Sequence, residues 1–194
     1  MSLKVTFELA DEDLDHFRRV MRQARELAKE RGTEEVLAAA ESLLERIKVV
    51  EVPEFIRDRL GSIKTLTEMV RDAEWNLPAP DRTRVVNALA YFCEPDDLIP
   101  DDVPGLGFLD DAIMVELVVR ELRHEIEAYQ DFCSYRVARD AQLSRGEDPV
   151  TRDEWLAARR KALQSRMRNR RKRQREQRSG GGSSSSTRSP FRLF

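Results

Sequence analysis

Residues 94–111 read EPDDLIPDDVPGLGFLDD and lie between two apolar stretches with helical spacing. The three prolines of this stretch exclude a continuous helix, because proline lacks an amide donor and its ring clashes with the preceding turn. Gly105 and Gly107 admit backbone conformations that other residues avoid. The stretch therefore predicts a compact corner that joins two helices.

Before the corner, apolar residues recur every three or four positions, which is the period of an amphipathic helix. This pattern predicts successive helices, which begin at or near Asp11, Thr33, Pro53 and Asp81. Gly32 should end the first of them, and Thr33 should cap the second.

After the corner, one long helix should run from about Asp110 towards Gln142, closed by Gly146 and Pro149. A further helix should start at Thr151, which forms a capping box with Glu154. The predicted fold class is therefore all-α. It is a helical bundle of about five main helices with a Pro/Asp-rich corner, followed by a basic C-terminal helix.

The two ends of the chain differ from this helical pattern. Leu3, Val5, Phe7 and Leu9 alternate with polar residues, which predicts a short strand-like segment. Such a segment needs a partner. It could pair with residues 47–52, pair across a homodimer or lie on the helices, and the sequence leaves these alternatives open. Residues 179–194 are rich in Gly and Ser and predict a flexible tail.

The charge is divided unevenly along the chain. Residues 159–194 hold thirteen Lys or Arg and one acid, a net charge of +12, while residues 1–158 carry a net charge of −14. We therefore divide the chain into an acidic helical domain (1–148), a basic helical arm (151–178) and the tail (179–194). The arm could fold back on the acidic domain or bind an external polyanion.

The corner closely resembles the signature of the YkvA-like family of uncharacterised helical domains. That signature is an ordered series of fixed positions, which read Pro, Asp, Leu-Ile-Pro-Asp, Pro, Gly and Asp-Asp. The matching residues here are Pro95, Asp97, Leu98, Ile99, Pro100, Asp101, Pro104, Gly107, Asp110 and Asp111. With its flanking helices the resemblance covers about residues 85–125. It implies a helical fold and offers no catalytic residues to carry over.

The aspartates of the corner have two interpretations. They can cap turns and helix starts, where negative charge is favoured. They can also supply oxygen ligands to Mg²⁺ or Ca²⁺. The candidate metal ligands are Asp97, Asp101, Asp110 and Asp111.

The arm carries eleven basic residues between Arg159 and Arg178, against the single acid Glu176. Clustered Lys and Arg bind nucleic-acid phosphates with strong salt dependence. The candidate polyanion-binding residues are Arg166, Arg168, Arg170, Arg171, Lys172, Arg173 and Arg175. An anionic membrane surface is a weaker candidate partner, because the arm lacks the aromatic and Leu-rich side of interfacial helices.

The sequence contains no nucleophile elbow, phosphate-binding glycine loop or HExxH motif. Apolar runs stay far shorter than the ~20 residues of a membrane span, and two widely spaced cysteines fit a reducing compartment. We therefore expect a cytoplasmic, non-catalytic scaffold or adaptor. Its arm would bind nucleic acid or an acidic protein surface. The alternative is a divalent-metal domain, with enzymatic activity left open.

Overall fold

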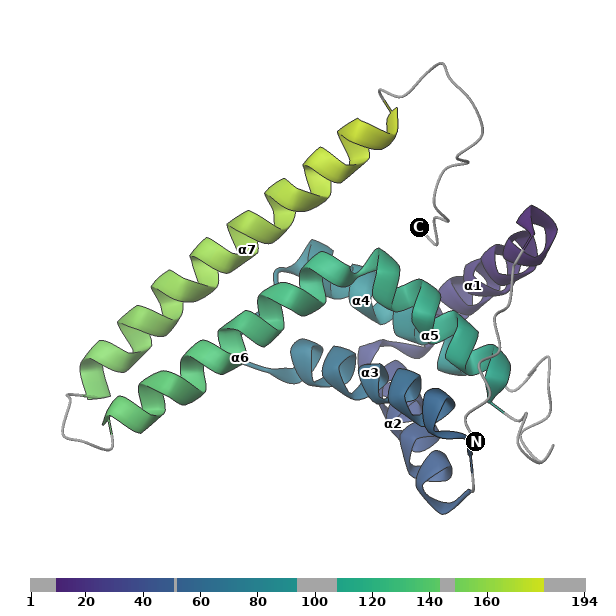
Figure 1. The fold of residues 1–194 in the computed structure, drawn as a ribbon, viewed down its shortest axis with the longest axis horizontal. Helices are drawn as coiled ribbons and strands as arrows, with labels where there is room; N and C mark the ends of the chain where they lie inside the picture. The colour runs from purple at the N-terminus through teal and green to yellow at the C-terminus, as the bar shows by residue number, and fades with distance from the viewer. Residues whose placement is uncertain (1–9, 51, 94–107, 144–148, 180–194) are drawn as a thin grey trace, which may run out of the picture.

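The computed structural model describes residues 10–50, 52–93, 108–143 and 149–179, and within them it contains seven α-helices and one 3₁₀ helix (Figure 1). The helices are α1 (Asp11–Arg31), α2 (Thr33–Val49), α3 (Glu54–Arg71), α4 (Ala79–Leu89), η1 (Ala90–Cys93), α5 (Leu109–Glu121), α6 (Arg123–Leu143) and α7 (Pro149–Ser179). The predicted all-α class is confirmed. The strand-like segment of residues 3–9, most of the corner and residues 180–194 lie outside the described residues.

The predicted apolar stripes form one continuous core. The stripe of α3 is buried along its whole length, from Ile56 to Val70, and the stripe of α2 is buried from Val36 to Ile47. Both join the apolar residues of α4, α5 and α6 in a single cluster. Since packing of an amphipathic face supplies most helix stability, the stripe residues determine which side of each helix faces inward.

The turn between α1 and α2 depends on Gly32. Its φ angle is +83°, a left-handed conformation that glycine adopts without penalty. Gly32 occupies the N-cap position of α2, and Thr33 is the first helical residue, so the prediction that Thr33 caps this helix was wrong by one residue.

The long helix predicted from Asp110 to Gln142 is wrong in one respect, because a bend at Leu122 divides it into α5 and α6 (Figure 1). Leu122 has φ −96° and ψ 15°, away from helical values. The guanidinium of Arg84, on α4, donates to the carbonyl oxygen of Glu121 at 3.2 Å. A side chain that inserts against the backbone ladder of a helix is a known cause of such a kink.

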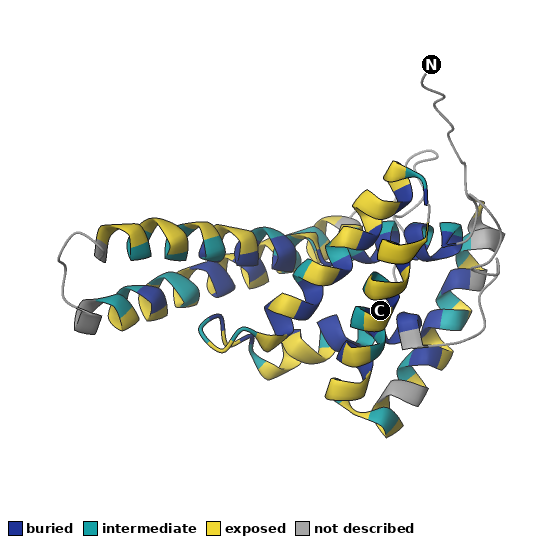
Figure 2. Cartoon of the chain, turned by 90° about the horizontal axis from the view of Figure 1, so that it is seen from below, coloured by how far each residue is buried: buried dark blue, intermediate teal, exposed yellow. Residues whose placement is uncertain are grey.

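Helices α6 and α7 form an antiparallel hairpin that projects from the rest of the molecule (Figures 1 and 2). Helix α7 begins at Pro149, two residues before the predicted start at Thr151. Proline was expected to close the preceding helix, but its restricted φ also suits a first helical turn. Leu156, Leu163 and Met167 of α7 are buried and belong to the common core, so the basic helix packs on the acidic domain.

Candidate functional site

Asp110 and Asp111 lie in the first turn of α5, and both are buried, with 3% of each residue exposed. The helix follows Phe108, whose φ of +66° places it in the left-handed region. This conformation is unusual for a bulky residue and costs about 1–2 kcal/mol. The Phe108 ring is buried, and the Arg46 guanidinium lies 5.7 Å from its centroid. Burial of the ring offsets the backbone cost and determines where the two carboxylates lie.

Asp97 and Asp101, the other two candidate metal ligands, lie outside the described residues. Among the residues that the structure does describe, no group of three His, Cys, Asp or Glu side chains could hold a metal ion. Asp110 and Asp111 alone supply fewer oxygens than Mg²⁺ or Ca²⁺ requires. The metal site therefore stays a prediction. The helix-start role of Asp110 and Asp111 agrees with their position at the positive end of the α5 dipole.

A buried ion cluster holds α7 against α4 and α6. One nitrogen of Arg171 lies 2.7 Å from a carboxylate oxygen of Asp81 and 2.7 Å from one of Glu125. Asp81 is 1% exposed and Glu125 is fully buried. Arg84 completes the cluster, with ion pairs to Glu121 at 2.8 Å and to Glu125 at 3.4 Å. Buried carboxylates are tolerated only when such partners compensate their charge.

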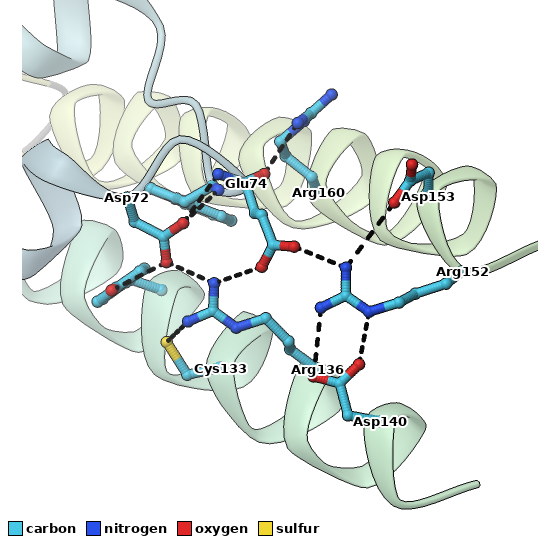
Figure 3. Close-up of polar contacts among 10 residues, drawn as sticks. Asp72, Glu74, Cys133, Arg136, Asp140, Arg152, Asp153 and Arg160 are labelled. Atoms are coloured by element: carbon cyan, nitrogen blue, oxygen red, sulfur yellow. Dashed lines mark hydrogen bonds and ion pairs between the residues drawn. The ribbon is translucent and has the colours of Figure 1, made fainter. Parts of the chain in front are cut away.

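A second ion cluster surrounds the segment between α3 and α4 (Figure 3). Arg136 of α6 donates to Asp72 at 2.7 Å and to Glu74 at 2.9 Å. Arg152 of α7 donates to Glu74 at 2.6 Å and also pairs with Asp140 of α6. Glu74 therefore ties both helices of the hairpin to the domain.

The carboxylates of this second cluster have lowered pKa values. Burial raises the pKa of Asp72, but hydrogen bonds from the Trp75 amide and the Arg136 guanidinium outweigh burial and lower it. The pKa of Glu74 lies below its ordinary value chiefly because Arg152 donates a hydrogen bond to it. The ionised forms are therefore favoured, as expected of carboxylates with structural roles.

Two further contacts fasten the middle of α7. The Gln164 side chain is buried and donates to the carbonyl oxygens of Trp75 at 2.9 Å and Asn76 at 3.3 Å. Arg160 donates to the carbonyl oxygen of Glu74 at 2.8 Å. These bonds satisfy backbone groups of the α3–α4 segment that helix packing would otherwise leave without partners.

The structure separates the predicted polyanion-binding residues into two groups. Arg170 pairs with Glu127 at 3.0 Å, and Arg171 is engaged by Asp81 and Glu125. The remaining five are exposed, as is Lys161: Arg166, Arg168, Lys172, Arg173 and Arg175. Of these, Arg168 also lies 3.8 Å from a carboxylate oxygen of Asp81.

The sequence did not reveal the acidic partners of α7. Asp81 and Glu125 are 44 residues apart, and each lies in an ordinary charged stretch. The one available signal was the helical spacing of Leu156, Leu163 and Met167, which predicts a side of α7 that packs against something. This spacing does not indicate which carboxylates of the other helices lie next to the packed side of α7.

Comparison with known proteins assigns the family. A family model described as "Protein of unknown function (DUF1232)" matches residues 81–117, which include most of α4 and most of α5. The "Uncharacterized membrane protein YkvA" of Bacillus subtilis (strain 168) is 34% identical over 74 residues, covering 35% of this chain and 68% of that protein. The chain belongs to the YkvA-like family. No solved structure matches this YkvA-like chain.

The matched YkvA-like region contains Asp81, Arg84, Asp110 and Asp111. It therefore includes both the start of the buried ion cluster and the buried carboxylates of α5. None of the described helices has the length and apolar character that a membrane span requires. Helix α7 lies outside residues 81–117, which the family model matches.

Proposed function

We propose that this chain is a non-catalytic scaffold or adaptor that binds a polyanion, above all nucleic acid, through one side of α7. The observation that carries the proposal is the exposure of six basic residues of α7 other than Arg170 and Arg171. We call the exposed group the outward basic face: Lys161, Arg166, Arg168, Lys172, Arg173 and Arg175. Arg170 and Arg171 are left out of this face because carboxylates of the domain hold them at 3.0 and 2.7 Å, whereas Arg168 lies 3.8 Å from Asp81.

The charge of the outward basic face favours phosphate contacts. Each Lys or Arg that neutralises a phosphate releases condensed counterions, so affinity falls with salt. Six contacts to duplex DNA correspond to a slope of about −5 in log K against log salt concentration. The affinity should therefore fall about 10³-fold between ~50 and ~200 mM salt. This steep dependence separates the proposal from binding through apolar contacts.

An anionic membrane is a less favoured partner. The related YkvA protein carries the words "membrane protein" in its name, which raises the question for this chain. However, Leu156, Leu163 and Met167 of α7 are buried against the domain. An interfacial helix needs an apolar side that can enter the lipid, whereas the apolar side of α7 is buried in the core. We therefore propose a cytoplasmic location, with nucleic acid ahead of membrane or acidic protein as partner.

The test is a salt titration of binding between the full chain and a labelled DNA duplex. Replacement of all six residues of the outward basic face with glutamine should abolish retention. The thermal transition should change little, since these side chains are exposed and Arg168 lies 3.8 Å from its carboxylate partner Asp81, which Arg171 holds at 2.7 Å. Replacement of Lys29 and Lys64 with glutamine, on α1 and α3, is the control for a general loss of charge. Equal binding by the six-residue variant and the wild type would contradict the proposal, and binding only to anionic vesicles would favour the membrane.

A divalent-metal domain is the second candidate function, and the burial of the adjacent carboxylates Asp110 and Asp111 favours it. Such a site would draw its other ligands from Asp97 and Asp101, and any catalytic role would depend on the ion. Millimolar Mg²⁺, Mn²⁺ or Ca²⁺ should then raise the melting temperature by mass action. The substitution Asp101→Asn should remove that increase. An unchanged melting temperature in all three metals would eliminate this candidate.

A homodimer formed through residues 3–9 stays a prediction. Sedimentation of the full chain and of a variant with Phe7→Asp tests it, since a charge on the apolar side of a strand would prevent pairing. A monomer in both samples would exclude the dimer.

A further inference from the structure

We infer that the outward basic face of α7 recognises the major groove of double-stranded DNA, an inference that rests on the function proposed above. The reason is how the exposed side chains are distributed around the helix. With 3.6 residues per turn, positions three, four or seven apart lie on one side. The exposed basic residues therefore form two separate rows rather than one broad patch.

The first row consists of Lys161, Arg168, Lys172 and Arg175, and the second row consists of Arg166 and Arg173. Arg168 lies at the edge of the first row nearest the domain, 3.8 Å from Asp81. At about 100° per residue, the two rows are about 140° apart around the helix axis. Ser165 and Asn169, both exposed, lie between the rows and form a ridge of small polar side chains. Glu176 lies at the end of this ridge, 3.8 Å from Lys172.

The ridge lies opposite the side of α7 that packs on the domain. The buried residues Leu156, Leu163 and Met167 are centred about 160° from Ser165 and Asn169. The outward side of the α6–α7 hairpin is exposed along its length (Figure 2). A large ligand can therefore approach the ridge with a basic row on each side of it, while α7 stays docked.

The dimensions of this arrangement match the major groove of B-form DNA. An α-helix with its side chains is about 10–12 Å across, and the groove is about 12 Å wide. From Lys161 to Arg175 the helix rises about 21 Å, which corresponds to about six base pairs. Inserted with its ridge towards the bases, α7 would direct one basic row at the phosphates of each strand. Ser165 and Asn169 would then lie near base edges, where such side chains donate and accept hydrogen bonds.

Other polyanions use this geometry less well. The major groove of A-form RNA is deep and narrow, so a helix cannot enter it, and only one row could reach phosphates. Single strands are usually held by stacking on aromatic side chains, and no aromatic residue occurs between positions 156 and 190. The inference therefore ranks duplex DNA above duplex RNA and single-stranded DNA.

The test compares three probes with the full chain: a DNA duplex of about 20 base pairs, the RNA duplex of the same sequence, and single-stranded oligothymidylate of equal length. The DNA duplex should bind at least about tenfold more tightly than either alternative at equal salt. Its salt slope should be about −5, against about −3 for duplex RNA, because only one row makes contacts there.

Two variants test the two rows separately. The pair Arg166→Gln and Arg173→Gln removes the second row, and the pair Lys161→Gln and Lys172→Gln removes half of the first. Each pair should reduce the DNA salt slope by about 2, since two phosphate contacts are lost. The pair Lys29→Gln and Lys64→Gln removes the same charge outside α7 and should leave the slope unchanged.

The outcomes distinguish the inference from the proposed function. Preference for duplex DNA, with both row variants weakened, supports the inference. Equal binding of the three probes, or loss of affinity in one row variant only, overturns groove recognition while the polyanion function stands. If no probe is retained at low salt, the proposed function fails and the inference fails with it.

Discussion

Replacement of Arg171 with glutamine should destabilise the protein far more than the same replacement of its neighbour Arg170. Arg171 compensates the charges of Asp81 and Glu125, which are 1% exposed and fully buried. Arg170 pairs with Glu127, and both of these side chains are about half exposed. The two substitutions remove the same charge from adjacent positions of one helix, so they form a matched pair.

The magnitude follows from the burial of the partners. Removal of one member of a buried ion pair costs about 3–5 kcal/mol, because it leaves a charge without compensation in a poorly solvated site. The Arg171 side chain is itself 19% exposed, so water can partly replace it, and we expect the lower end, about 3 kcal/mol. An exposed pair such as Arg170–Glu127 contributes about 0–1 kcal/mol.

Urea unfolding monitored by circular dichroism measures the free energy of unfolding of both variants. For a chain of this size, a loss of about 3 kcal/mol in that free energy lowers the melting temperature by roughly 6–12 °C. A triple variant with Arg171→Leu, Asp81→Asn and Glu125→Gln should recover much of the loss, because the uncompensated charges are gone. Equal free energies of unfolding for Arg171→Gln and Arg170→Gln would refute the reasoning that buried carboxylates anchor α7.

Three further predictions concern stability. Gly32→Ala should lower the free energy of unfolding by about 1 kcal/mol, because φ at this position is +83°. Gly61→Ala should raise it by about 0.5–1 kcal/mol, because Gly61 lies inside α3 and the added methyl group meets open space. Thermal melts of the two variants should therefore shift in opposite directions. Gln164→Ala should cost about 1–3 kcal/mol in urea unfolding, because it removes the donor to the buried Trp75 carbonyl. Burial raises the pKa of Asp72, but hydrogen bonds from the Trp75 amide and the Arg136 guanidinium outweigh burial and lower that pKa below the ordinary 3.8. Ionised Asp72 therefore stabilises the fold above about pH 4, and this stabilisation is lost as the pH falls through the pKa of Asp72 in the folded protein. The stability difference between wild type and Asp72→Asn should therefore narrow below pH 4 in melts at several pH values.

The helices and their buried sides could be predicted because they depend on local spacing. The stripe of α3 from Ile56 to Val70 and that of α2 from Val36 to Ile47 follow from the 3.6-residue period, and both are buried as expected. Errors occurred where a single contact between distant residues changes the backbone. The bend at Leu122 depends on Arg84, which lies more than 30 residues earlier in the chain, and no local pattern reports that contact.

The candidate site shows the same limit. The basic character of α7 was evident from the sequence, and so was the apolar strip formed by Leu163 and Met167. Which arginines face carboxylates was not evident, because Arg171 meets Asp81 across 90 residues of chain. The separation of α7 into an engaged side and an outward basic face therefore required the packed structure.

By itself, the sequence determined an all-α chain with a Pro/Asp-rich segment and a basic C-terminal helix, because periodicity, proline content and charge are local properties. The tertiary structure alone decided that α7 packs along α6 and that Arg171 closes a buried ion cluster with Asp81 and Glu125. Helix periods specify which side is apolar, but the partner of that side depends on the packing of the whole chain. Charge pairing across the fold is a consequence of that packing, and it leaves Lys161, Arg166 and Arg173 on the outer surface.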